Sequence, residues 1–412
     1  MPNSKDKEFI RVKDLINKIK FNEALQILEE IERRNGLPIN DQLTCRLLKA
    51  SILNKQGKYE DGLKLAEEIL KESTELKKPL KVVDAHIVML EALDMLAFAS
   101  DYFDKFDEGL KLAEQSEQVL KTLSEEQSET IKRSASLKYW KGRLLCRKHI
   151  KTPINLKVME NLDQALEYLQ EGLNLYKKLD DKTGIAQSLR NIGEVFGVKN
   201  DIDQQLDYNL QSLTICEKIG FKIGMADSFN KLAFVYRLKG DFRQSLEYIE
   251  QALPIYKEIG NKSLIVSILY QLGFYYINIS DLNRALECYQ ELIQLYKELG
   301  NKRAVSTFLN HIVYIYLRKG EVGQALDYNQ QNLTLAEKLK DKGLVSYALI
   351  ARGGIYAQKG DLKQALEDLE RSLNLAEEDG SKFLIALALS SLGYVYSYKG
   401  ELEQSLEYVQ RL

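Results

Sequence analysis

Apolar residues along this chain recur at helical spacing, in stripes that come in pairs. Ile265, Leu269, Leu272 and Tyr276 follow one another at intervals of four, three and four residues, which places them on one face of a helix. A short turn at Ser280 leads to a second stripe, formed by Leu282, Ala285, Leu286, Tyr289, Leu292, Ile293 and Tyr296. The pattern predicts a helical hairpin over residues 261–300.

The same pattern repeats along most of the chain. The segment Gly240–Tyr248 recurs at Gly320–Tyr328, and related segments begin at residues 160, 200, 280, 360 and 400, so the repeat is 40 residues long. Weaker copies begin near Ile19, Gly57 and Asp104. One hairpin cannot bury its own apolar face, so neighbouring hairpins must stack into a continuous core. We therefore expect an all-α solenoid of about ten helix-turn-helix repeats, roughly twenty helices, forming one continuous elongated body.

The regularity of the repeat changes along the chain. Residues 1–159 are expected to form irregular repeats, with units starting near 5, 39, 79 and 125 and an insertion at about 147–158 that either makes a loop or lengthens the helices. Residues 160–412 are expected to form regular repeats. The last helix starts near Leu402 and stops at Leu412, so the final repeat is predicted to be incomplete. Its uncapped apolar face suggests fraying, self-association or a further domain after Leu412.

The residues within a repeat carry a family resemblance. Leu272-Gly273-x-x-Tyr276, followed by Ala285 and an aromatic residue at Tyr289, resembles the tetratricopeptide (TPR) helix-turn-helix pattern. The 40-residue unit resembles the long-helix subclass that includes the spindle-orientation adaptors, which bind peptides inside a TPR superhelix. The resemblance implies a right-handed α-solenoid in which the free face of each first helix lines a concave groove.

The residues on this free face differ strongly between repeats, whereas the core positions stay fixed, so stacking does not specify them. Aromatic side chains with interspersed Asn and Arg suit the binding of a partner peptide. The alternative is that these aromatic side chains simply pack against the adjacent helix. The candidate groove residues are Arg143, Arg190, Asn230, Phe234, Tyr270, Phe274, Asn310, Tyr314, Tyr347 and Tyr394.

Composition and motifs narrow the functional classes. The formal net charge is −2, from 58 basic and 60 acidic residues, which gives no general reason for nucleic-acid or membrane binding. The three histidines and four widely spaced cysteines offer little for a metal site or a catalytic triad, and no phosphate-binding or zinc-binding motif occurs. There is no apolar run of membrane-spanning length and no signal peptide. We therefore expect a cytoplasmic protein that is not an enzyme and has no cofactor or metal.

One segment is locally basic. Residues 130–159 contain nine Lys or Arg residues and no acid, which suits an acidic peptide, a phosphate or RNA. The favoured alternative is a solvated segment neutralised by acids nearby in the sequence, namely Glu125, Glu126, Glu129, Glu160 and Asp163. Because the rest of the chain is neutral, a protein partner is preferred over nucleic acid.

Taken together, these features predict a non-enzymatic protein–protein interaction scaffold or adaptor that binds a partner peptide or helix in its concave groove. Two other functions remain open at this stage. The chain could be the TPR sensor region of a larger signalling protein, or a basic-patch RNA-binding protein.

Overall fold

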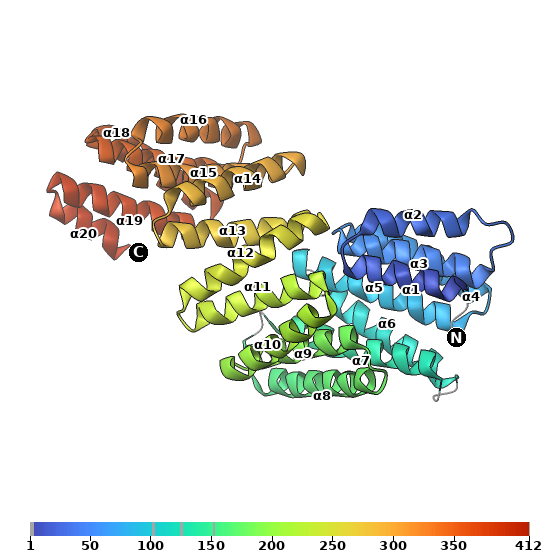
Figure 1. Ribbon diagram of the computed structural model, residues 1–412. Helices are drawn as coiled ribbons and strands as arrows, with labels where there is room; N and C mark the ends of the chain where they lie inside the picture. The colour runs from blue at the N-terminus through green and yellow to red at the C-terminus, as the bar shows by residue number, and fades with distance from the viewer. Residues whose placement is uncertain (1–3, 101–103, 124–126, 151–152, 412) are drawn as a thin grey trace. The chain divides into compact units, whose positions relative to one another are not determined.

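The predicted helical stripes form twenty helices and no strand in the part of the chain that the computed structural model describes, which is residues 4–100, 104–123, 127–150 and 153–411 (Figure 1). The first ten helices are α1 (Ser4–Asn17), α2 (Phe21–Glu32), α3 (Ile39–Lys55), α4 (Tyr59–Glu75), α5 (Pro79–Ser100), α6 (Asp104–Lys121), α7 (Ser128–Lys148), α8 (Leu156–Lys178), α9 (Lys182–Val198) and α10 (Ile202–Ile219). The other ten are α11 (Lys222–Leu238), α12 (Phe242–Ile259), α13 (Lys262–Asn278), α14 (Leu282–Glu298), α15 (Lys302–Lys319), α16 (Val322–Leu339), α17 (Lys342–Lys359), α18 (Leu362–Asp379), α19 (Lys382–Lys399) and α20 (Leu402–Gln410). The prediction of about ten helical hairpins is confirmed.

The turns between helices rely on two local devices. The Asp281 side chain accepts a hydrogen bond from the backbone N–H of Arg284 at 3.2 Å and so caps α14. Such a cap satisfies a helix N–H group that has no partner within the helix. At the other end of a helix, Gly320 adopts a φ of 74° after α15, a left-handed conformation that glycine reaches without strain. These devices explain why Asp and Gly recur every 40 residues.

The core follows the repeated apolar positions. One position of the first helix is buried in all six regular repeats. It is occupied by Leu189, Phe229, Leu269, Leu309, Leu349 and Leu389. Small residues lie where helices approach closely. A Cβ atom added to Gly273 would lie 2.8 Å from the ring of Tyr289, so a larger residue there would push the two helices of the hairpin apart.

The two helices on either side of the predicted insertion are longer than those of the next hairpin. Helix α7 has 21 residues and α8 has 23, compared with 17 in α9 and 18 in α10. Helix α8 begins at Leu156, where the Asn155 side chain accepts a hydrogen bond from the N–H of Val158 at 2.9 Å.

Contacts divide the chain into two compact units, unit 1 (Met1–Ile265) and unit 2 (Val266–Leu412), with the boundary inside α13. This boundary does not coincide with the change from irregular to regular repeats at residues 159–160. Contacts define the boundary, whereas sequence periodicity defines the change in regularity.

Within each unit, odd-numbered helices pack against one another as well as against their hairpin partners. In unit 1, α3 contacts α5, α5 contacts α7, and α9 contacts both α7 and α11. In unit 2, α15 contacts α17 and α17 contacts α19. In a stack of hairpins, the layer whose helices also touch the next repeat lies on the inner, more closely packed side. We call the odd-numbered helices the inner layer.

The last helix is expected to exchange its amide hydrogens faster than α16 or α18. Helix α20 contains no buried residue, and Leu402, Leu406 and Val409 remain 67%, 57% and 49% exposed. Few buried contacts mean a low free energy of local opening. Hydrogen exchange with mass spectrometry checks this, over a series of protein concentrations to detect self-association. Protection in α20 equal to that in α18 at all concentrations would contradict the expectation.

Candidate functional site

Several aromatic side chains of the inner layer of unit 2 are exposed to solvent, including Phe383 and Tyr398 near the two ends of α19, and four of them hold positions predicted for the groove. Tyr270 and Phe274 lie on α13, Tyr314 on α15 and Tyr394 on α19, and they are 45%, 50%, 47% and 67% exposed. Phe274, Tyr314 and Tyr394 hold the same position in their repeats. We call these four residues the aromatic row. Their exposure shows that core packing does not account for them.

The members of the aromatic row differ in how firmly they are held. The Tyr270 ring packs edge-on against Phe308, with centroids 5.9 Å apart, and near His311 at 6.3 Å. The Tyr314 hydroxyl accepts a hydrogen bond from Arg318 at 3.3 Å. Tyr270 therefore combines a packing role with surface exposure, whereas Phe274 and Tyr314 extend further from the core.

Two of the predicted groove residues in unit 2, Tyr347 and Asn310, are partly or fully buried. Tyr347 is partly buried against the core between α17 and α19, and burial raises the pKa of its hydroxyl. Asn310 is 4% exposed, and its Oδ1 accepts a hydrogen bond from Asn332 Nδ2 at 2.9 Å. The Asn310 side chain thus links α15 to α16 inside the hairpin and does not face an open groove.

In unit 1, the predicted groove residues on α11 are partly accessible. Phe234 is 41% exposed, and the guanidinium carbon of Arg237 lies 4.9 Å from the centre of its ring. This distance is typical of a cation–π contact. Asn230 is half-buried one turn earlier on the same helix.

Arg143 and Arg190 were expected to place positive charge in a groove, but their side chains are only 13% and 6% exposed and are paired within the chain. Arg143 forms an ion pair with Asp94 at 2.9 Å and donates a hydrogen bond to Asn191 Oδ1 at 2.8 Å. Arg190 is paired with Asp227 at 3.1 Å. Neither side chain presents an uncompensated charge on an open surface, because the inner layer of unit 1 supplies its own carboxylates.

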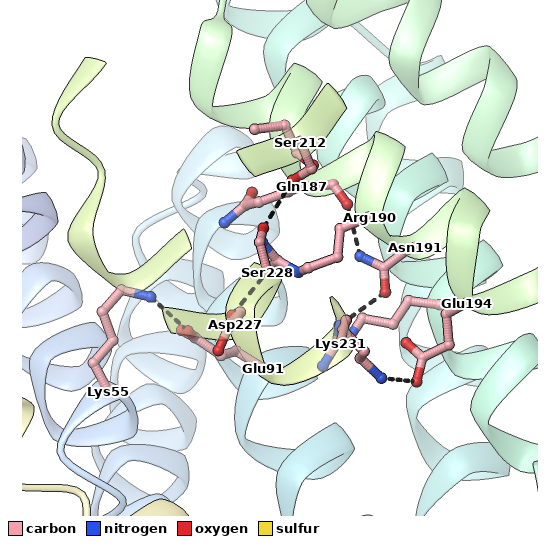
Figure 2. Close-up of polar contacts among 12 residues, drawn as sticks. Lys55, Glu91, Gln187, Arg190, Asn191, Glu194, Ser212, Asp227, Ser228 and Lys231 are labelled. Carbon is pink, nitrogen blue, oxygen red and sulfur yellow. Dashed lines mark hydrogen bonds and ion pairs between the residues drawn. The ribbon is translucent and has the colours of Figure 1, made fainter. Parts of the chain in front are cut away.

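These pairs belong to a larger set of polar contacts, which we call the inner polar network. Lys231 contacts Glu194 at 2.5 Å and Lys55 contacts Glu91 at 2.8 Å, as Figure 2 shows. Asp94 also binds Arg147, at 2.6 Å. All members come from α3, α5, α7, α9 and α11: Lys55, Glu91, Asp94, Arg143, Arg147, Arg190, Asn191, Glu194, Asp227 and Lys231. The network fills the inner layer of unit 1 with charges of both signs.

The electrostatics of the network favour its ionised form. Burial alone would raise the pKa of the Glu194 carboxyl, but Lys231, Arg147 and Arg143 together lower it well below its usual range. For Arg143, burial opposes the charge while the Asp94 carboxylate raises the pKa well above its ordinary value. Each buried charge is thus stabilised by opposite charges on neighbouring inner helices.

A further contact ties the first repeats of unit 1 to its last residues. The Asn261 side chain donates to the Lys55 carbonyl at 3.2 Å and to the Tyr59 hydroxyl at 2.9 Å. Gly57 lies between them with a φ of 80°, and a Cβ atom at this position would come within 2.7 Å of the Asn261 side chain. The α3–α4 turn therefore lies directly against residue 261.

Seven of the eight described bases in the segment 130–159 pair with acids, only partly with those expected, and Glu125 and Glu126 lie outside the described residues. Glu129 does pair with Arg133, at 2.7 Å, but Asp163 binds Lys199 instead. Most partners are distant in sequence and lie on α5, α6, α8 or the turn before α9: Asp84, Asp94, Asp107, Glu117, Glu171 and Asp181. Lys151 lies outside the described residues. The segment is thus a structural element of unit 1.

Two further features of the described residues concern metal binding and membrane insertion. They contain no group of three or more His, Cys, Asp or Glu side chains that could hold a metal ion. Of the helices described, none combines the length and apolar character needed to cross a bilayer.

Several network residues carried a signal that sequence reasoning missed. Two network ion pairs join opposite charges that lie about one repeat minus one helical turn apart in the sequence: Lys55 with Glu91 at a separation of 36 residues, and Glu194 with Lys231 at 37. A residue on one helix meets the residue one turn earlier on the equivalent helix of the next repeat, so this spacing marks contacts between repeats.

Comparison with known proteins now identifies the repeat. The tetratricopeptide repeat model matches residues 224–298, 303–378 and 344–412. Among solved structures, the apo form of RapI aligns with a TM-score of 0.58 at 13% identity and covers 90% of this chain and 96% of its own. The quorum sensor NprR from B. thuringiensis aligns with a TM-score of 0.55 at 14% identity, covering 90% and 98%. Comparison with curated protein sequences gives no match.

A signal-transduction ATPase with a tetratricopeptide repeat sensor, from Pyrococcus horikoshii, also aligns, with a TM-score of 0.53 at 16% identity. This alignment covers 90% of the present chain but 55% of the ATPase. At such identities the likeness concerns the fold alone, and the resemblance to spindle-orientation adaptors stays a prediction. The chain is thus an α-solenoid of helical hairpins that contains tetratricopeptide repeats.

Proposed function

We propose that unit 2 binds a segment of a partner protein, extended or helical, across the aromatic row. The observation that carries this proposal is the exposure of Phe274, Tyr314 and Tyr394 at equivalent positions of three inner helices, where core packing does not account for the rings. Flat aromatic anchors contribute much of the binding energy in protein interfaces. A group of them on one face of a monomer is typical of an interaction site.

The proposed role is that of a non-enzymatic scaffold. Stacked repeats hold a binding face rigidly without forming an enclosed catalytic pocket. A cytoplasmic location belongs to the same proposal, since all four cysteines are free and buried as thiols, in keeping with a reducing compartment.

A sensor region of a signalling protein is the second candidate. Its support is the fold likeness to NprR, named as a quorum sensor, and to the ATPase whose repeats are named as a sensor. Both candidates require a ligand on the repeats, so the first experiment serves both. RNA binding is not proposed, because the basic segment is paired with the chain's own acids.

Replacing Phe274 or Tyr314 with alanine is expected to weaken partner binding about 30-fold, which corresponds to about 2 kcal/mol for an aromatic anchor. The loss should lie mainly in the dissociation rate. A peptide selected from a display library on the immobilised full chain serves as the ligand, and biolayer interferometry gives both rate constants.

Phe242→Ala provides the matched control, because Phe242 is also 50% exposed but lies on the even-numbered helix α12 of unit 1. Circular dichroism should show unchanged helicity in all three variants. If the Phe242 variant loses binding while both aromatic-row variants bind like the wild type, the ligand uses another surface.

A further inference from the structure

The aromatic row has a gap on α17. Phe274, Tyr314 and Tyr394 hold equivalent positions in their repeats. In the repeat that begins with α17, the equivalent residue is Gly354. Gly354 is exposed, and a Cβ atom added to it would meet no atom within 4 Å beyond the local helix backbone. By contrast, a Cβ atom on the preceding Gly353 would lie 2.7 Å from Leu369.

Packing therefore explains Gly353 but not Gly354. A glycine inside a helix costs about 1 kcal/mol relative to alanine, and at residue 354 neither the backbone conformation nor a close neighbour requires it. The effect of the glycine is to keep open the space that an aromatic ring fills in the repeats on either side.

The surroundings of this space are apolar and aromatic. Helix α17 packs against both α15 and α19, so Tyr314 and Tyr394 occupy the equivalent positions on its two neighbours. Ile350 lies one turn earlier on α17 and is 8% exposed. A space flanked by two exposed rings beside a buried isoleucine suits one large apolar side chain.

Charge is distributed unequally between the two layers of unit 2. The inner helices α15, α17 and α19 contain nine Lys or Arg residues and no Asp or Glu, whereas α14, α16, α18 and α20 contain thirteen acids and five bases. Five of the nine inner bases pair with acids outside the inner helices: Arg303 with Asp341, Lys319 with Glu321, Lys342 with Glu378, Arg352 with Asp368 and Lys399 with Glu401. No acid on the inner helices offsets the charge of the other four bases, so this layer favours an anionic segment over a cationic one.

We propose that the space at Gly354 receives one large apolar side chain from a negatively charged segment of a partner protein. This inference rests on the proposed function, and it adds the chemistry of the ligand. The glycine determines which side chain the inner face accepts, and the basic inner helices determine the charge that must flank it.

Three fluorescein-labelled 12-residue peptides of Gly, Ser and Glu test the inference with the full chain. The first carries one central Phe, the second has Ala in its place, and the third keeps Phe but has Lys instead of each Glu. In fluorescence anisotropy, the first peptide should bind at least tenfold more tightly than either of the others. The preference for Glu over Lys should shrink as salt rises.

Gly354→Leu fills the space, so this variant should bind the Phe and Ala peptides with about equal affinity. Gly354→Ala should retain most of the preference for Phe over Ala, because a methyl group occupies little of the space. Gly323→Leu is the matched control, since Gly323 lies on the outer helix α16 and a Cβ atom there also meets nothing within 4 Å. Circular dichroism checks that each variant stays helical.

The inference is overturned if the wild type binds the Phe and Ala peptides equally or not at all, or if Gly354→Leu behaves like Gly323→Leu. The wider proposal can survive the failure of this inference. If Phe274→Ala and Tyr314→Ala weaken binding of the library-selected peptide while Gly354→Leu does not, the aromatic row binds a partner without using the space at Gly354.

Discussion

Replacing Asp94 with alanine is expected to lower the free energy of unfolding by about 3–5 kcal/mol. The Asp94 side chain is fully buried and binds Arg143 at 2.9 Å and Arg147 at 2.6 Å. Removing the carboxylate leaves two buried guanidinium groups without their shared counter-charge, and little water can replace it. Urea denaturation followed by circular dichroism measures the change.

Two further variants separate a lost charge from a lost side chain. Asp94→Asn keeps the volume and one acceptor oxygen, so its loss of stability should be smaller than that of the alanine variant. Asp14→Ala removes the acid from an ion pair with Lys18 whose side chains are 52% and 49% exposed, and its effect should stay below about 1 kcal/mol. An Asp94→Ala protein as stable as the Asp14 variant would show that the inner polar network adds nothing to the fold.

The fold could be predicted because its physical determinants lie close together in the sequence and recur. A hairpin needs one apolar stripe per helix, a capping residue such as Asp281 and a glycine at the turn, all within 40 residues. Each repeat then contains the same sequence features. The core column that includes Leu269 and Leu349 was therefore visible in the sequence, as was the position of each turn.

The polar interior of unit 1 was harder to predict, because its contacts depend on how repeats pack. Asp94 lies 49 residues before Arg143 and 53 before Arg147. These separations fall in the irregular region, where the lengthened α7 and α8 remove any fixed period. The sequence also placed Arg143 and Arg190 correctly on inner helices, but it could not show that carboxylates from neighbouring helices already neutralise them.

The internal pairing of these arginines favours unit 2 over unit 1 as the binding site. A groove role for Arg143 and Arg190 is disfavoured, because Asp94 and Asp227 already hold these arginines. Phe274 and Tyr394 instead make ring contacts, with Tyr275 and Tyr398 respectively. The binding proposal therefore rests on unit 2 alone.

Acidification is expected to destabilise unit 1 through His86. This side chain on α5 is 5% exposed, and burial lowers its pKa to about 4. Its Nδ1 lies 2.7 Å from the Ser116 hydroxyl, which donates its own hydrogen to the Leu112 carbonyl at 3.0 Å. Nδ1 must therefore carry the hydrogen and donate to Ser116, and the neutral ring takes up a proton in the folded protein only at the cost of a buried charge.

The sign follows from comparing the two states. Unfolded His86 binds a proton below a pKa of about 6.5, whereas folded His86 stays neutral down to about 4. Stability from this residue is complete above pH 6.5 and falls as the pH drops to about 4, by roughly 3 kcal/mol in total. Urea midpoints between pH 7.5 and 4 should therefore decline less steeply in His86→Gln, which removes this titration while leaving His149 and His311 in place. Because carboxylates also begin to titrate near pH 4, the difference between the two proteins at pH 5–6 is decisive. Parallel curves there would mean that His86 is protonated in the folded state, and that the Ser116 contact does not hold it neutral.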